Sequence, residues 1–148
     1  MSSWRDTASA QTQDDLDRLL NVALGFAQHE LDKRGEFFPY AVAIKGDGSV
    51  EMFAAPPNPS SDRPAAADVI ASCLSQLASK RNQLRAAAIV AGIRSQEYGG
   101  DAIEVNLEHI QGPALRVQLS YARRTPGAGV EYGQIRAQSG DRRVWPSI

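Results

Sequence analysis

The side chains best suited to catalysis or metal binding lie close together in one short stretch, at Glu104, Glu108 and His109. Two carboxylates on one face of an element can hold a cation, and an imidazole beside a carboxylate is a common general acid–base pair. However, this stretch alternates apolar and polar residues, as a strand does, and successive side chains of a strand point to opposite faces. Glu104 and Glu108 should therefore share a face, exposed to solvent, while His109 points away from them. We predict no catalytic residue, and an enzyme built on these three side chains is the least favoured hypothesis.

Two other potentially reactive side chains lack partners in the sequence pattern. His29 falls near the end of a helical stretch, where an imidazole sits beside the helix dipole without an identifiable nucleophile. Cys73 lies on an apolar stripe between Ile70 and Leu74, which is typical of inert packing. One cysteine and two histidines cannot supply a cysteine-based zinc cage, so we predict no metal and no cofactor.

Positive charge gathers in the last third of the chain. Residues 113–148 carry two carboxylates, Glu131 and Asp141, and these six arginines: Arg116, Arg123, Arg124, Arg136, Arg142 and Arg143. Strand alternation places two of them on the polar face predicted for the two glutamates, which gives a candidate face for an anion or a protein partner: Glu104, Glu108, Arg116, Gln118 and Arg136. The carboxylates weaken the field of this face, the net charge is -1, and Tyr121 and Tyr132 fall on inward parities. These features argue against nucleic acid.

The elements that must position these residues follow from periodicity and turn signals. Residues 1–11 are read as a flexible terminus, and residues 12–148 as a single domain. Thr12 is the expected cap of a helix that ends at Lys33-Arg34-Gly35. A hairpin is predicted over 40–45 and 49–54, a proline-rich loop over 56–64, and a helix from Pro64 or Ala65 to about residue 80. The buried stripe of this helix is expected at Ile70, Cys73, Leu74, Leu77 and Ala78. The alanine-rich stretch over 85–94 is apolar on both parities, which favours a central strand, and a helix is the alternative. A turn at 98–101, a hairpin over 101–109 and 114–123, a loop over 125–129 and a strand over 130–137 follow.

The hairpin over 101–123 gives the clearest signal. The apolar side chains Ile103, Val105 and Leu107 alternate with polar ones, and the second strand repeats the pattern, which indicates one dry and one wet face. If Leu107 lies opposite Val117, Glu108 forms a cross-strand ion pair with Arg116. The fold class is therefore α+β: a single domain with a largely antiparallel sheet of five to six strands and two helices packed on one face.

The order of the elements resembles that of roadblock/longin-like and profilin-like domains, and this resemblance implies a fold without a function. A second resemblance rests on short segments: Phe38-Pro39-Tyr40-Ala41 with Asp47-Gly48, Asp101-Ala102-Ile103 with Leu107-Glu108-His109 and Gly112-Pro113-Ala114, and Glu131-Tyr132-Gly133. These segments are similar to a small family of bacterial α+β proteins, which implies no activity.

The sequence predicts a cytoplasmic protein. Its start is polar, and no apolar run reaches the roughly 20 residues that a bilayer requires. The two-faced sheet favours a non-enzymatic domain that binds a protein partner or forms a symmetric homodimer through its wet face. A domain that binds a small ligand or anion through Arg116 and Arg136 is the alternative.

Overall fold

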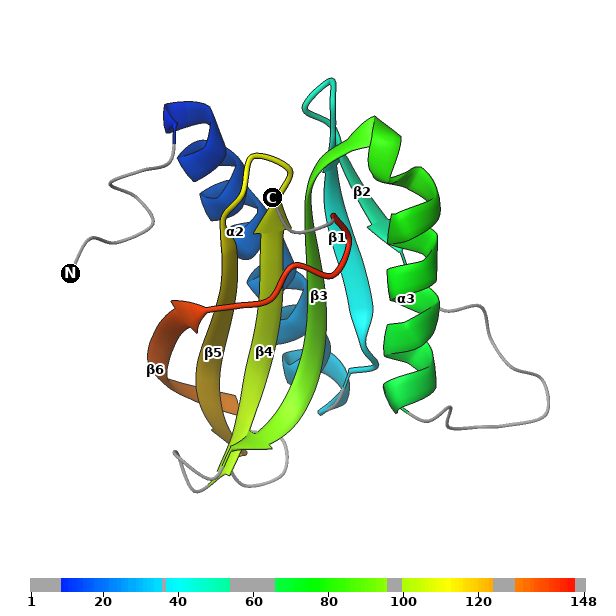
Figure 1. Ribbon diagram of the computed structural model, residues 1–148. Helices are drawn as coiled ribbons and strands as arrows, with labels where there is room; N and C mark the ends of the chain where they lie inside the picture. Colours follow the sequence, from blue (N-terminus) through cyan, green and yellow to red (C-terminus); the bar gives the residue numbers. More distant parts are fainter. Residues whose placement is uncertain (1–8, 36, 54–65, 96–99, 124–129, 146–148) are drawn as a thin grey trace.

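The computed structural model describes residues 9–35, 37–53, 66–95, 100–123 and 130–145. It shows an α+β arrangement of two α-helices and a six-stranded antiparallel sheet (Figure 1). The helices are α2 (Ala10–Arg34) and α3 (Ala66–Lys80), followed by a short 3₁₀ turn, η1 (Arg81–Gln83). The strands are β1 (Tyr40–Lys45), β2 (Val50–Phe53), β3 (Leu84–Ser95), β4 (Gly100–His109), β5 (Ala114–Arg123) and β6 (Val130–Ser139).

The strands lie in the order β2-β1-β3-β4-β5-β6, and every neighbouring pair is antiparallel. This confirms the predicted hairpins, the inner position of the alanine-rich strand and the antiparallel sheet. The expected loops over 56–64 and 125–129 and the turn at Tyr98-Gly99 lie outside the described residues. No described helix is long and apolar enough to cross a membrane.

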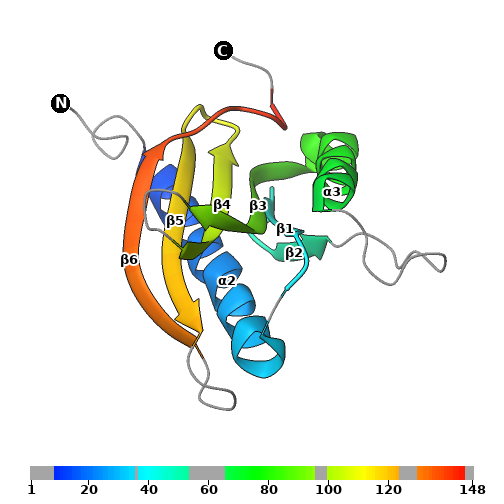
Figure 2. The ribbon, with the colours of Figure 1, turned by 90° about the horizontal axis from the view of Figure 1, so that it is seen from below.

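The prediction that both helices pack on one face is wrong. Leu16, Leu19 and other side chains of α2 pack with Val42 and Ile44, whereas Val69, Cys73 and Leu77 of α3 pack with Ala41 and Ala43 of the same strand. Because neighbouring residues of a strand point to opposite faces, the two helices lie on opposite sides of the sheet, as Figure 2 shows. The physical reason is that β1 and the first half of β3 are apolar on both parities, so both of their faces must be covered.

Helix α2 begins slightly earlier than predicted. Its N-cap is Ser9, whose hydroxyl accepts a hydrogen bond from the Thr12 backbone N–H at 3.1 Å, so Thr12 is not the cap. The predicted end is confirmed, because Gly35 closes the helix in the left-handed conformation, at φ 76°. Helix α3 buries Val69, Cys73 and Leu77, while Ala78, which was expected on its buried stripe, is exposed.

The hairpin of β4 and β5 has its predicted faces but a different register. Ile103, Val105 and Leu107 are buried against α2 together with their β5 neighbours. Leu107 lies opposite Leu115, two residues from the expected partner, and the turn passes through Gly112 at φ 137°. As a result Arg116 lies opposite Asn106, and the predicted pair between Glu108 and Arg116 does not form.

Candidate functional site

A row of polar side chains crosses β4, β5 and β6 on the face opposite α2. Aligned register positions bring together Glu104, Gln118 and Arg136, and beside them Asn106, Arg116 and Gln138. We call these six residues the polar face. It contains four of the five residues predicted for a partner or anion face.

Side chains of the polar face form two hydrogen-bonded groups. The Glu104 carboxylate accepts from the Gln118 amide at 2.8 Å and from the Asn106 amide at 3.1 Å. With the Gln138 amide turned so that its oxygen faces Arg116, this oxygen accepts from the guanidinium at 3.0 and 3.2 Å. Helix α3 packs mainly against β1 and β3, and among the polar face only Asn106 borders the small cavity beneath it. The result is a pre-ordered array of charges and amides that faces outward.

A shallow hollow of about 600 Å³ adjoins the polar face. Its floor has small residues, among them Gly100, Ser120 and Gly133, and Arg136 stands in its lining. The strand pairing is irregular here, and the Ser120 hydroxyl accepts from the Gln134 backbone N–H at 3.0 Å. A side chain at Gly133 would meet this hydroxyl at 2.4 Å, so the Ser120 side chain would have to rotate and give up this hydrogen bond.

The prediction that Glu108, the fifth residue of the candidate face, is exposed to solvent is wrong. Glu108 lies on the same side of β4 as the polar face, but it is 5% exposed instead of solvated. Its carboxylate accepts three backbone hydrogen bonds, from the N–H groups of residues 143, 144 and 145, at 3.0, 2.7 and 3.2 Å. Glu108 therefore holds the chain's own backbone and offers nothing to an external ligand.

The segment bound by Glu108, residues 140–145, is here called the C-terminal strap. It leaves the end of β6 and crosses β4 toward α3 (Figure 1). Val144 and Trp145 are buried with Leu77 and Ile89, and the Arg142 guanidinium donates to the His109 carbonyl at 2.8 Å. The remaining cavity between the strap, α3 and the sheet is about 10 Å³, no larger than a single water requires.

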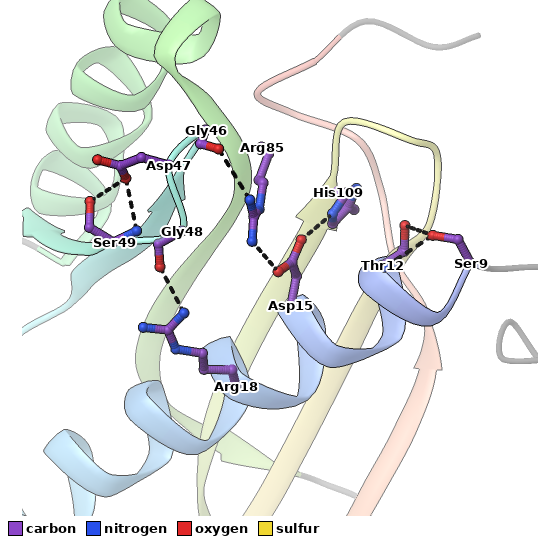
Figure 3. Close-up of polar contacts among 10 residues, drawn as sticks. All are labelled: Ser9, Thr12, Asp15, Arg18, Gly46, Asp47, Gly48, Ser49, Arg85 and His109. Carbon is purple, nitrogen blue, oxygen red and sulfur yellow. Dashed lines mark hydrogen bonds and ion pairs between the residues drawn. The ribbon is translucent and has the colours of Figure 1, made fainter.

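A second buried polar cluster lies on the opposite face, at the start of α2 (Figure 3). Asp15 bridges two partners: one carboxylate oxygen lies 2.9 Å from His109 Nε2, and the other accepts from Arg85 at 2.9 Å. His109 Nδ1 accepts from the Gln111 backbone N–H at 3.1 Å. With both ring nitrogens engaged and only 2% of the residue exposed, His109 has no nitrogen available for a substrate. The cluster joins α2 to β3 and β4 and is unsuited to proton transfer.

The same corner also holds the β1–β2 turn. Arg85 donates to the Gly46 carbonyl at 3.2 Å, and Arg18 of α2 donates to the Gly48 carbonyl at 2.7 Å. Hydrogen bonds from the Ser49 hydroxyl and backbone N–H lower the pKa of Asp47. Through these hydrogen bonds the cluster also holds the β1–β2 turn against α2 and β3.

The remaining reactive side chains are not brought together. His29 is exposed on α2, and Cys73 lies on the buried side of α3, where burial raises the pKa of its thiol. Within the described ranges, no group of three His, Cys, Asp or Glu side chains could hold a metal ion.

Sequence reasoning missed Asp15, Arg85 and Gln138. A signal existed for Asp15, because its position lies four residues before Leu19 on the apolar stripe of the helix. A carboxylate there must be paired, but the identity of its partners depends on the packing of α2 on the sheet. Comparisons with protein-family models, curated proteins and solved structures gave no match. The two resemblances drawn from the sequence therefore stay predictions.

Proposed function

We propose that this chain is a non-enzymatic protein-interaction domain that binds its partner through the polar face. The observation that carries the proposal is the unequal covering of the sheet. On the side of α3, the helix and the strap bury β1, the first half of β3 and the end of β4, while the polar face extends from their border at Asn106 to exposed residues of β5 and β6. A hydrogen-bonded surface that spans three strands suits another folded protein, and its border at Arg136 adjoins the concave hollow that a small ligand would need.

The chemistry of the polar face defines a suitable partner. It carries two guanidinium groups, Arg116 and Arg136, and one carboxylate, Glu104, beside three amides. Arginine and amide groups donate to backbone carbonyls and carboxylates, and arginine is enriched at the centres of protein interfaces. A polar, slightly acidic protein surface is the expected counterpart. The single buried thiol suits a cytoplasmic location.

Site-specific cross-linking in cells tests this proposal. A photo-reactive amino acid at Gln118 should give one dominant adduct, and the same group at Asn21, on the exposed side of α2, should not. Arg116→Glu in the Gln118-labelled chain should abolish the adduct. Equal labelling from both positions, or an adduct that survives Arg116→Glu, would contradict binding through the polar face.

Binding of a small anion is a second candidate, because Arg136 lines the hollow of about 600 Å³. Titration of the protein with inorganic phosphate should then shift amide NMR signals around Ser120 and Gln134. Arg136→Gln should remove these shifts, and Arg34→Gln, which changes an exposed arginine on α2, should leave them intact. Shifts spread evenly over the surface would indicate non-specific ion binding.

A further inference from the structure

Strand β6 lies at the edge of the sheet and is exposed along most of its length. We infer that it pairs antiparallel with β6 of a second copy of the chain, about a twofold axis. The two six-stranded sheets would then form one continuous sheet. This inference goes beyond the proposed binding of a partner at the polar face, because its partner is a second copy of the chain. It places the joint at the edge of the sheet, next to the polar face.

The exposure of β6 is the first support. It is the last strand of the sheet order, so among the described residues its outer edge has no pairing strand. Every residue from 133 to 139 is exposed, which means that both faces of this part of the strand meet solvent. Ile135 is 55% exposed. A long, open strand with an exposed β-branched side chain and no proline or lysine is a template for strand pairing.

The opposite edge of the sheet supports the same conclusion by contrast. Strand β2 has only four residues, and its Glu51 carboxylate lies 3.5 Å from Lys45 and 3.1 Å from Lys80. Short length and flanking lysines are devices that discourage edge-to-edge pairing. The chain protects one edge in this way and leaves the other open.

The pairing with β5 shows which backbone N–H and C=O groups of β6 point outward, where a second strand could bind them. The Gly140 N–H donates to the Ala114 carbonyl at 2.9 Å, so even-numbered residues of this stretch direct their backbone groups toward β5. Alternation then directs the N–H and C=O groups of Ile135, Ala137 and Ser139 outward. Three donors and three acceptors are thus available in a row.

The register between the two β6 strands follows from these outward backbone groups and from the positions of the charged side chains. The regular pairing with β5 runs from the irregularity near residue 133 to Gly140, whose N–H donates to Ala114, and its centre is Ala137. A twofold axis at Ala137 pairs Ile135 with Ser139 of the second copy and sets Arg136 opposite Gln138. A centre at Arg136 would oppose two guanidinium groups, which is unfavourable. The strand carries one acidic and one basic residue, Glu131 and Arg136, so two copies do not repel each other.

A matched pair of proline variants tests the inference. Ala137→Pro removes an outward N–H and should leave the bonds to β5 intact, because proline is tolerated on the solvent side of an edge strand. Gln138→Pro removes an N–H directed at β5 and should damage the fold itself. By sedimentation equilibrium across a concentration series, the wild-type chain should have twice the monomer mass, and Ala137→Pro should fall to the monomer mass with unchanged circular dichroism.

A second variant and a hydrogen-exchange measurement test the same pairing without a proline substitution. Ile135→Lys, at an exposed position, should also give a folded monomer. In the wild-type dimer the amides of Ile135, Ala137 and Ser139 should be protected from hydrogen exchange, and dilution to monomer should remove that protection. A wild-type chain that stays monomeric, or a dimer that survives both variants, would overturn the inference. An adduct from Gln118 to a different protein would still support the proposed function in that case.

Discussion

At Glu108, one carboxylate receives three backbone N–H groups, and its replacement would leave three donors of the strap without a partner. A buried donor left without an acceptor costs about 1–3 kcal/mol, part of which water can recover. We expect Glu108→Ala to lower the free energy of unfolding by about 2–4 kcal/mol. Urea denaturation measures this change.

Glu104 is the matched control, because it lies four residues earlier on the same face of β4 and is partly exposed. Glu104→Ala removes only surface hydrogen bonds and should cost under about 1 kcal/mol. Equal losses for the two variants would mean that the strap does not depend on Glu108.

Asp15 is the shared partner of Arg85 and His109, and its side chain is 5% exposed. Removal of one partner from a buried ionic cluster typically costs about 3–5 kcal/mol, because the remaining groups stay buried without compensation. Asp15→Ala should show a loss of this size in thermal or urea unfolding. Asp14→Ala, at an exposed neighbouring position, should change the stability by less than about 0.5 kcal/mol. If Asp15→Ala leaves the free energy of unfolding unchanged, the cluster contributes little to the attachment of α2.

The raised pKa of Tyr132 makes the free energy of unfolding depend on pH in the alkaline range. Burial and the nearby Asp32 carboxylate raise the pKa of Tyr132 from 10.0 to about 12, so the folded chain keeps the phenol proton where the unfolded chain loses it. The resulting stabilisation is complete below pH 10.0 and is lost as the pH rises toward 12. Tyr132→Phe should therefore reduce the decline in unfolding free energy over this interval. The same decline in wild type and variant would show that other groups cause it.

At the scale of elements, the strap depends on the close passage of Gly140 along β5. A Cβ at this position would lie 2.8 Å from the Leu115 carbonyl carbon and 3.0 Å from its oxygen, and the backbone cannot easily yield. Gly140→Ala should destabilise the protein by about 1–3 kcal/mol, as overpacking does. It should also increase the hydrogen exchange of the strap amides.

Gly25 provides the opposite case within α2. A Cβ there meets nothing within 4 Å, and the residue is exposed, so alanine adds no contact and lowers the entropy of the unfolded chain. Gly25→Ala should stabilise the protein by about 0.5–1 kcal/mol. The opposite signs of these two glycine substitutions, measured in parallel melts, would confirm that contact with β5 decides the effect at Gly140.

At the scale of the whole molecule, two cores share one sheet. Leu107 is buried in the core on the α2 side and Leu77 in the core on the α3 side, at 2% and 0% exposure. Because β1 and β3 contribute to both cores, loss of either core should weaken the entire sheet. Leu107→Ala and Leu77→Ala should each cost about 2–5 kcal/mol and retain a single unfolding transition.

Met52→Ala is a suitable comparison, because Met52 is 44% exposed on the edge strand β2. It should cost under about 1 kcal/mol. Two separate transitions in either leucine variant, seen by circular dichroism and by hydrogen exchange, would contradict a shared sheet and indicate independent units.

Local chemistry determined the elements of this protein. The alternation around Val105 and Val117 predicts a strand pair with one buried face, the cations before Gly35 predict the helix end, and both are confirmed. These features depend on the period of side chains and on backbone conformations at single residues, which neighbours in sequence control. The grouping of Glu104, Arg116, Gln118 and Arg136 on one face follows from the same period.

Tertiary structure alone decided which helix covers which face and what lies over each polar residue. The apolar residues on both parities of β1 and of the first half of β3 indicate that both faces need a cover, but they do not say which helix covers which face. Glu104 and Glu108 have the same local pattern, and they differ because the strap, from more than 30 residues further along the chain, crosses only Glu108. Likewise Asp15 and His109 meet across 94 residues of sequence. Contacts between such distant segments depend on how whole elements pack, and no local pattern encodes that arrangement.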